Sequence, residues 1–74
     1  MSVLYWFDIF RAAGFKLDCA LDFARAAHNN VPDYFNVYIR HGVFPVSYIK
    51  RANAGRIPVD DVFDYARRAY RRGF

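Results

Sequence analysis

The sequence predicts an all-α fold, a single compact bundle of about five short helices spanning residues 1–74. Three observations support this prediction. Apolar residues recur at intervals of three and four along much of the chain, which is the period of a helix buried along one face. Glycines follow these stretches and prolines open them, as expected where helices end and begin. The connections between the stretches are short, which favours direct packing of consecutive helices.

Glycine and proline residues set the expected helix boundaries. A glycine follows each of four periodic stretches, where a left-handed residue ends a helix at little steric cost, at positions 14, 42, 55 and 73. A proline opens each of three stretches, where its missing amide donor is not needed, at positions 32, 45 and 58. We therefore expect helices over Val3 to Ala13, Leu17 to His28, Pro32 to His41, Pro45 to Ala54 and Pro58 to Arg72.

The first and third expected helices are apolar almost all round. The apolar residues of the first are Leu4, Trp6, Phe7, Ile9 and Phe10. Those of the third are Tyr34, Phe35, Val37, Tyr38 and Ile39. Such helices lie in the centre of a core or bury a second face against a partner.

The second and fifth expected helices each carry one apolar stripe that we expect to face the core. The stripe of the second consists of Leu17, Ala20, Leu21, Ala24 and His28. The stripe of the fifth consists of Val59, Val62, Phe63, Ala66 and Tyr70. Residues 17–27 and 59–69 also match at several positions, either through duplication or because both helices are built mainly from Ala, Asp and Arg. We favour the second explanation.

The composition gives no support for catalysis. With Cys19 as its one cysteine, the chain has neither an intrachain disulfide nor a thiol cluster for a metal. His28 and His41 each end an expected helix, where an imidazolium complements the helix dipole. No phosphate loop or nucleophile motif is present. We predict a protein that is not an enzyme and has no cofactor, metal or small-molecule substrate.

The opening apolar run, residues 3–7, stops at Asp8 and is far shorter than a membrane-spanning helix. No basic stretch precedes a cleavable hydrophobic segment, so no signal peptide is expected. These observations predict a cytoplasmic protein. A peptide bound at the membrane surface is the least favoured alternative, because the seven aspartates would face anionic lipid.

The net charge of +4 comes entirely from the second half of the chain. Residues 1–32 carry three bases and three acids, whereas residues 33–74 carry eight bases and four acids. The segment between Tyr34 and Val59 has no acid, and its bases are Arg40, Lys50, Arg51 and Arg56. Such a surface attracts phosphate groups or an acidic protein face, although a solvated basic face is a common alternative.

The four arginines near the end of the last helix divide into two pairs. Asp64 lies three residues before Arg67 and four before Arg68, so it can pair with either. Arg71 and Arg72 have no acid at this spacing and are the better candidates for phosphate contact.

Several segments resemble the lambda-repressor and Cro type of helix-turn-helix domain. Residues 10–15 (FRAAGF) are similar to the end of the family's first helix, and residues 23–27 (FARAA) to its second. Residues 28–31 then correspond to the turn, residues 32–41 to the recognition helix, and residues 42–45 to the Gly-x-x-Pro exit. The resemblance implies a five-helix DNA-binding domain. It places near the major groove Asp33, Tyr34, Asn36, Val37 and Arg40.

Two functions remain open, and we favour the first narrowly. The first is a small DNA-binding regulator of transcription, a monomer or a homodimer, with a nucleic-acid-binding surface of Asn36, Arg40, Lys50, Arg51, Arg56, Arg71 and Arg72. Here Asn36 reads an adenine edge and the bases neutralise phosphates. The second is a protein-binding module, such as a small phage-like inhibitor or an oligomerising adaptor. It uses arginines and the exposed aromatic residues Tyr34, Tyr38 and Tyr48.

Overall fold

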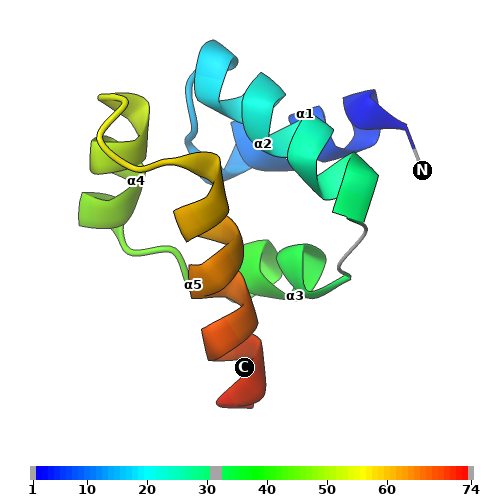
Figure 1. The fold of residues 1–74 in the computed structure, drawn as a ribbon, viewed down its shortest axis with the longest axis vertical. Coiled ribbons are helices and arrows are strands. Elements are labelled where there is room, and N and C mark those ends of the chain that lie inside the picture. Colours follow the sequence, from blue (N-terminus) through cyan, green and yellow to red (C-terminus); the bar gives the residue numbers. More distant parts are fainter. Residues whose placement is uncertain (1, 31–32, 74) are drawn as a thin grey trace.

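The computed structural model describes residues 2–30 and 33–73, and its secondary structure is entirely helical (Figure 1). The helices are α1 (Val3–Ala13), α2 (Leu17–Asn30), α3 (Tyr34–Arg40), α4 (Val46–Asn53) and α5 (Val59–Arg71). The predicted all-α bundle is therefore confirmed. The predicted start of the third helix, Pro32, lies outside the described residues. None of the described helices is long and apolar enough to cross a membrane.

The helix ends show why the predicted boundaries differ by one or two residues. Pro45 and Pro58 do not begin α4 and α5 but precede them, with extended ψ angles of 147° and 154°. A proline in this conformation suits the capping position, because its φ of about −60° to −65° is compatible with extended backbone. At the N-terminus of α1, the Ser2 hydroxyl accepts a hydrogen bond from the amide of Tyr5 at 3.3 Å. Gly14 closes α1 with a φ of 108°, which favours glycine.

The helices enclose a core that consists mainly of aromatic rings. In Figure 1, α5 runs down the middle of the view between α4 and α3, and α1 and α2 lie above them. Phe10 of α1 lies 5.6 Å from Phe35 of α3, and Phe35 lies 4.8 Å from Phe63 of α5, centroid to centroid. Both contacts are edge-to-face, the geometry that the ring quadrupoles favour. The apolar first and third helices thus contribute Trp6, Phe10, Phe35 and Tyr38 to the core.

Two predicted apolar stripes are wrong in part. In α2 the buried residues are Ala20, Phe23, Ala24 and Ala27, while Leu17 remains 61% exposed. The bulky Phe23 ring packs 5.1 Å from Phe15, and this contact turns the leucine side of α2 toward solvent. In α5, Ala69 is buried and Tyr70 is 51% exposed, because the Tyr70 ring packs on Tyr34 at the surface, with centroids 5.0 Å apart.

The side chain of Asn53, at the end of α4, holds this helix against the turn between α1 and α2. Its amide nitrogen donates to the carbonyl oxygen of Gly14 at 3.1 Å. Its oxygen accepts from the backbone amide of Lys16 at 2.8 Å. Nearby, the Cys19 thiol donates to the carbonyl oxygen of Ala52 at 2.9 Å, and burial raises the pKa of this thiol. These contacts fix one end of α4 and therefore its position beside α5.

Candidate nucleic-acid interface

An open groove of about 630 Å³ is lined by residues of α4, α5 and the connection between them. Its basic residues are Arg51, Arg56, Arg67, Arg68 and Arg71. The acidic residues in its lining are Asp61 and Asp64. Five arginines against two aspartates give the lining a formal charge of +3.

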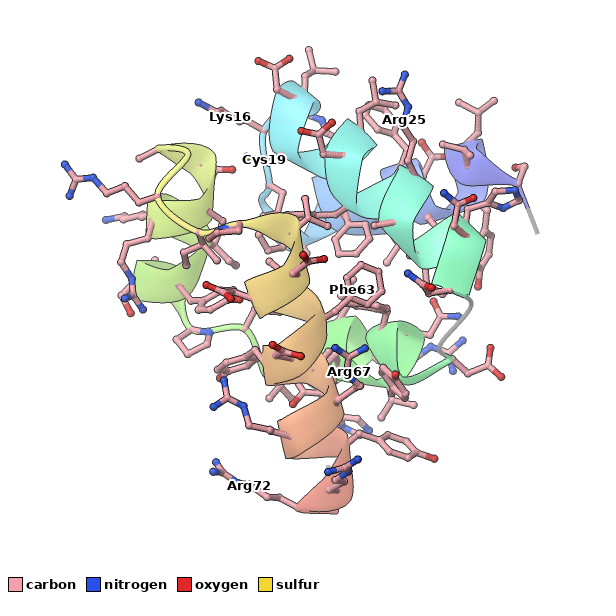
Figure 2. The ribbon with its side chains drawn as sticks, viewed as in Figure 1. Lys16, Cys19, Arg25, Phe63, Arg67 and Arg72 are labelled. Atoms are coloured by element: carbon pink, nitrogen blue, oxygen red, sulfur yellow. The ribbon has the colours of Figure 1, made fainter. Side chains whose placement is uncertain are left out.

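Three of the predicted nucleic-acid-binding residues therefore meet in one place, namely Arg51, Arg56 and Arg71. Arg40, Lys50 and Arg72 are exposed but are not part of the groove lining. Figure 2 shows Arg72 at the end of α5, while Lys16 and Arg25 of the charge-balanced half lie at the opposite end of the molecule. The bases that line the groove thus all come from the second half of the chain.

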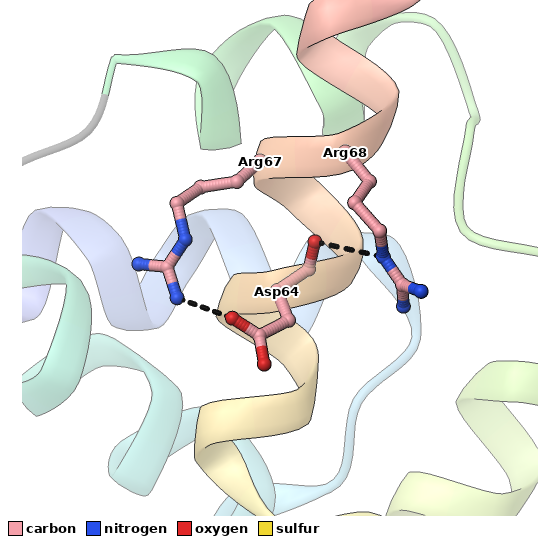
Figure 3. A network of polar contacts seen from close by, with 3 residues as sticks. All are labelled: Asp64, Arg67 and Arg68. Atoms are coloured by element: carbon pink, nitrogen blue, oxygen red, sulfur yellow. Dashed lines mark hydrogen bonds and ion pairs between the residues drawn. The ribbon is translucent and has the colours of Figure 1, made fainter.

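Arg67 and Arg68 also line the groove, although the sequence assigned them only to pairing with Asp64. Arg67 forms an ion pair with the Asp64 carboxylate at 2.5 Å, and this hydrogen bond raises the pKa of Arg67 (Figure 3). Arg68 instead donates through Nε to the backbone carbonyl oxygen of Asp64 at 3.3 Å, which leaves its terminal amino groups unused (Figure 3). The sequence feature that indicates Arg68 as a groove residue is its position three residues before Arg71, which places both side chains on the same face of α5.

Four groove arginines have no carboxylate partner. Within residues 2–30 and 33–73, the ion pair between Arg67 and Asp64 is the one salt bridge present. An arginine that has no carboxylate partner can donate hydrogen bonds through its planar guanidinium group to an anion that enters the groove. The groove is therefore suited to phosphate or carboxylate groups.

Two tyrosine rings, those of Tyr48 and Tyr65, line the groove and pack on Phe44. Tyr48 of α4 packs on Tyr65 of α5 with ring centroids 4.7 Å apart, and both rings contact Phe44, at 5.7 and 5.8 Å. We call these three residues the ring cluster. The Tyr65 hydroxyl donates to the carbonyl oxygen of Val43 at 3.3 Å. The guanidinium carbon of Arg51 lies 5.9 Å from the centroid of the Tyr48 ring.

Tyr48 combines deep burial with an unsatisfied polar atom. Tyr48 is only 7% exposed, and its hydroxyl has no hydrogen-bond partner among the described residues. Burial raises the pKa of Tyr48 to about 12, and the charge of Asp61 adds to this effect. The hydroxyl therefore stays protonated at neutral pH and retains its ability to donate a hydrogen bond.

The structure corrects the prediction of three exposed interface tyrosines. Tyr38 is completely buried and donates from its hydroxyl to the carbonyl oxygen of Tyr65 at 3.3 Å. Tyr48 is buried in the ring cluster. Tyr34 is the one of the three that lies at the surface, half-buried beside Tyr70. The burial follows from the position of α3 and α4 on either side of α5, which the periodicity of each helix alone does not define.

Helix α3, which the helix-turn-helix resemblance assigns to DNA recognition, is partly buried in the core. The Asn36 side chain is half-buried, and its amide donates to the Tyr5 hydroxyl of α1 at 3.0 Å. Asp33 and Arg40, at the two ends of α3, are exposed. α3 and its capping residue thus expose one acid and one base, and the Asn36 amide already donates to the Tyr5 hydroxyl.

Among residues 2–30 and 33–73, no group of three or more His, Cys, Asp or Glu side chains is placed to hold a metal ion. Comparison with protein families, curated proteins and solved structures finds no match to the chain.

Proposed function

We propose that this protein is a small DNA-binding protein that holds the phosphate backbone in the groove between α4 and α5. The observation that carries this proposal is the set of four groove arginines that have no carboxylate partner within residues 2–30 and 33–73. Guanidinium groups match phosphate oxygens in pairs of hydrogen bonds. Each phosphate that they neutralise also releases condensed counterions from DNA, which supplies most of the binding free energy of such contacts.

The proposal gives α3 a smaller role than the helix-turn-helix resemblance implies. Phosphate contacts position a protein on DNA without distinguishing its sequence, whereas side chains that reach base edges provide specificity. The amide of Asn36 is engaged by Tyr5, so base reading by this side chain requires the loss of that hydrogen bond. We therefore propose binding that depends weakly on sequence. A role in transcription regulation depends on specificity supplied by a partner or a second copy.

Salt dependence tests the proposal directly. The binding of a short fluorescent DNA duplex is measured by anisotropy at several salt concentrations. Contacts from about four arginines predict that the logarithm of the binding constant falls with the logarithm of salt concentration with a slope of about −3 to −4. Replacing Arg51 or Arg71 by Ala is expected to reduce the slope by about 1 each.

The matched control is Arg25→Ala, which removes an exposed arginine from α2 that does not line the groove. This variant is expected to leave the slope unchanged. Binding that is independent of salt, or an equal loss of slope in Arg25→Ala and Arg51→Ala, contradicts the proposal.

A protein-binding module that receives an acidic segment in the same groove is the competing function. Several large apolar residues are exposed, among them Leu4 at 70% and Val46 at 68%. They are spread over α1, α2, α4 and α5, and exposed apolar residues scattered in this way are normal on protein surfaces. A glutamate-rich peptide distinguishes the two functions, because tighter binding of this peptide than of DNA of equal charge favours the protein partner.

A further inference from the structure

The Tyr48 hydroxyl is the one buried side-chain polar atom without a hydrogen-bond partner in the part of the chain that the structure describes. Leaving a buried hydroxyl unpaired costs free energy, so such a group calls for an explanation. The neighbouring Tyr65 hydroxyl, in the same ring cluster, has its partner in the Val43 carbonyl oxygen. Tyr48 therefore differs from its neighbour in having an unused donor beside an arginine-rich groove.

We propose that the Tyr48 hydroxyl and the guanidinium groups of Arg51 and Arg68 form a subsite for one phosphate group within the groove. The inference rests on the proposed function in taking this phosphate to be a phosphodiester of the DNA backbone. A phosphate supplies only acceptor oxygens at its charged edge, and the subsite supplies only donors. In the described part of the chain, the terminal amino groups of Arg68 have no hydrogen-bond acceptor and Arg51 has no carboxylate partner.

Phosphate can reach the hydroxyl only after a side-chain rearrangement. The hydroxyl has essentially no exposed area in the unbound structure. Arg51, one turn after Tyr48 on α4, lies over the Tyr48 ring and is itself exposed. In the proposed subsite, an entering phosphate draws this guanidinium from the ring toward its own oxygens, and we propose that the same rearrangement exposes the hydroxyl. The rearrangement is a rotamer change of a surface side chain, which takes place within nanoseconds.

Asp61 opposes the binding of an anion at this position. It lines the groove, and its charge acts on the Tyr48 hydroxyl in the direction opposite to Arg51 and Arg68. The alternative to the subsite is a hydrogen bond from the Tyr48 hydroxyl to the Asp61 carboxylate. Replacing Asp61 by Ala removes both the charge and the acceptor. The phosphate subsite predicts tighter phosphate binding by Asp61→Ala, whereas a Tyr48–Asp61 hydrogen bond predicts lower thermal stability without tighter binding.

The test compares Tyr48→Phe with Tyr38→Phe, since each removes the hydroxyl of a buried tyrosine and Tyr38 does not line the groove. Inorganic phosphate is titrated at constant ionic strength, and the backbone amide shifts of α4 and α5 are followed by NMR. Losing a hydrogen bond to a charged group is expected to weaken phosphate binding by Tyr48→Phe about tenfold. Tyr38→Phe is expected to keep the wild-type affinity, and its melting temperature falls because the hydrogen bond to the Tyr65 carbonyl oxygen is lost.

The same variants are then measured with the DNA duplex. Tyr48→Phe is expected to weaken DNA binding about tenfold without changing the salt slope, because no charge is removed. Equal phosphate affinity in wild type and Tyr48→Phe, or no saturable phosphate shifts in wild type, overturns the subsite. If DNA binds with the predicted slope in that case, the proposed function stands alone. If the phosphate titration depends on Tyr48 but DNA does not bind, the subsite stands and the proposed function fails.

Discussion

At the scale of single residues, Tyr48 links binding to stability. Its buried hydroxyl has no partner among the described residues, so the folded protein carries the cost of desolvating this group without the compensation of a hydrogen bond. Tyr48→Phe removes the hydroxyl and retains the ring contacts with Phe44 and Tyr65. The variant is expected to be more stable than the wild type by about 1 kcal/mol. A gain in stability together with a loss in phosphate affinity distinguishes a binding residue from a purely structural one.

The raised pKa of Tyr48 predicts how stability depends on alkaline pH. In the unfolded chain the phenol ionises near its ordinary pKa of about 10, while in the folded protein burial raises the pKa of Tyr48 to about 12. The unfolded state therefore binds fewer protons between these values, and stability falls as pH rises through them. Two pH units correspond to a loss of about 3 kcal/mol from Tyr48.

Urea denaturation of wild type and Tyr48→Phe at a series of alkaline pH values measures this loss. Tyr38 and Cys19 also have pKa values raised by burial and contribute in the same direction to both proteins. The difference between the two proteins isolates Tyr48, and it is expected to widen in favour of the phenylalanine variant. Parallel stability curves contradict the assigned pKa.

At the scale of secondary-structure elements, the position of α4 depends on the two hydrogen bonds of Asn53. Asn53→Ala removes both bonds to the turn at residues 14–16 and is expected to destabilise the protein by about 1 to 3 kcal/mol. Asn53→Asp keeps the acceptor for the Lys16 amide but loses the donor to Gly14, so an intermediate effect is expected. Urea denaturation gives the free energies, and equal stability of the three proteins contradicts this role.

The helices show how far local sequence defines structure. Glycine and proline are local signals, so the ends of α1 and the starts of α4 and α5 were predicted to within one or two residues. Which face of a helix is buried depends also on its neighbours. In α2, the packing of Phe23 on Phe15 buries the Phe23 side of the helix and leaves Leu17 exposed. In α5, Tyr70 packs at the surface on Tyr34.

The candidate site was predictable only in part for the same reason. The absence of acid from the segment after Tyr34 pointed to Arg51 and Arg56, because composition is visible in the sequence. The groove itself requires α4 and α5 to lie side by side. The unpaired hydroxyl of Tyr48 requires the geometry of the ring cluster, and no sequence pattern contains that information.

At the scale of the whole molecule, the charge distribution favours one face for contact with DNA. The groove lining carries +3 of the net charge of +4, while residues 1–32 are neutral in sum. This asymmetry predicts that α3 contributes little to affinity. Asn36→Ala is expected to change the binding constant for a duplex less than about twofold, since loss of a base contact costs about tenfold or more.

Anisotropy titrations with duplexes of unrelated sequence test this prediction, and Arg51→Ala provides the positive control. A tenfold loss of affinity in Asn36→Ala, accompanied by weaker discrimination between duplexes, contradicts backbone binding and favours base reading by α3. Equal affinities for unrelated duplexes support the groove as the main contact.

The ring cluster also has a consequence for the kinetics of association. Because Phe44, Tyr48 and Tyr65 pack on one another and Tyr65 is hydrogen-bonded to Val43, the aromatic part of the groove lining exists before any ligand arrives. Only arginine side chains have to rearrange, and these move much faster than molecules diffuse together. Stopped-flow mixing with DNA is therefore expected to show a single phase whose rate rises linearly with DNA concentration and falls with salt.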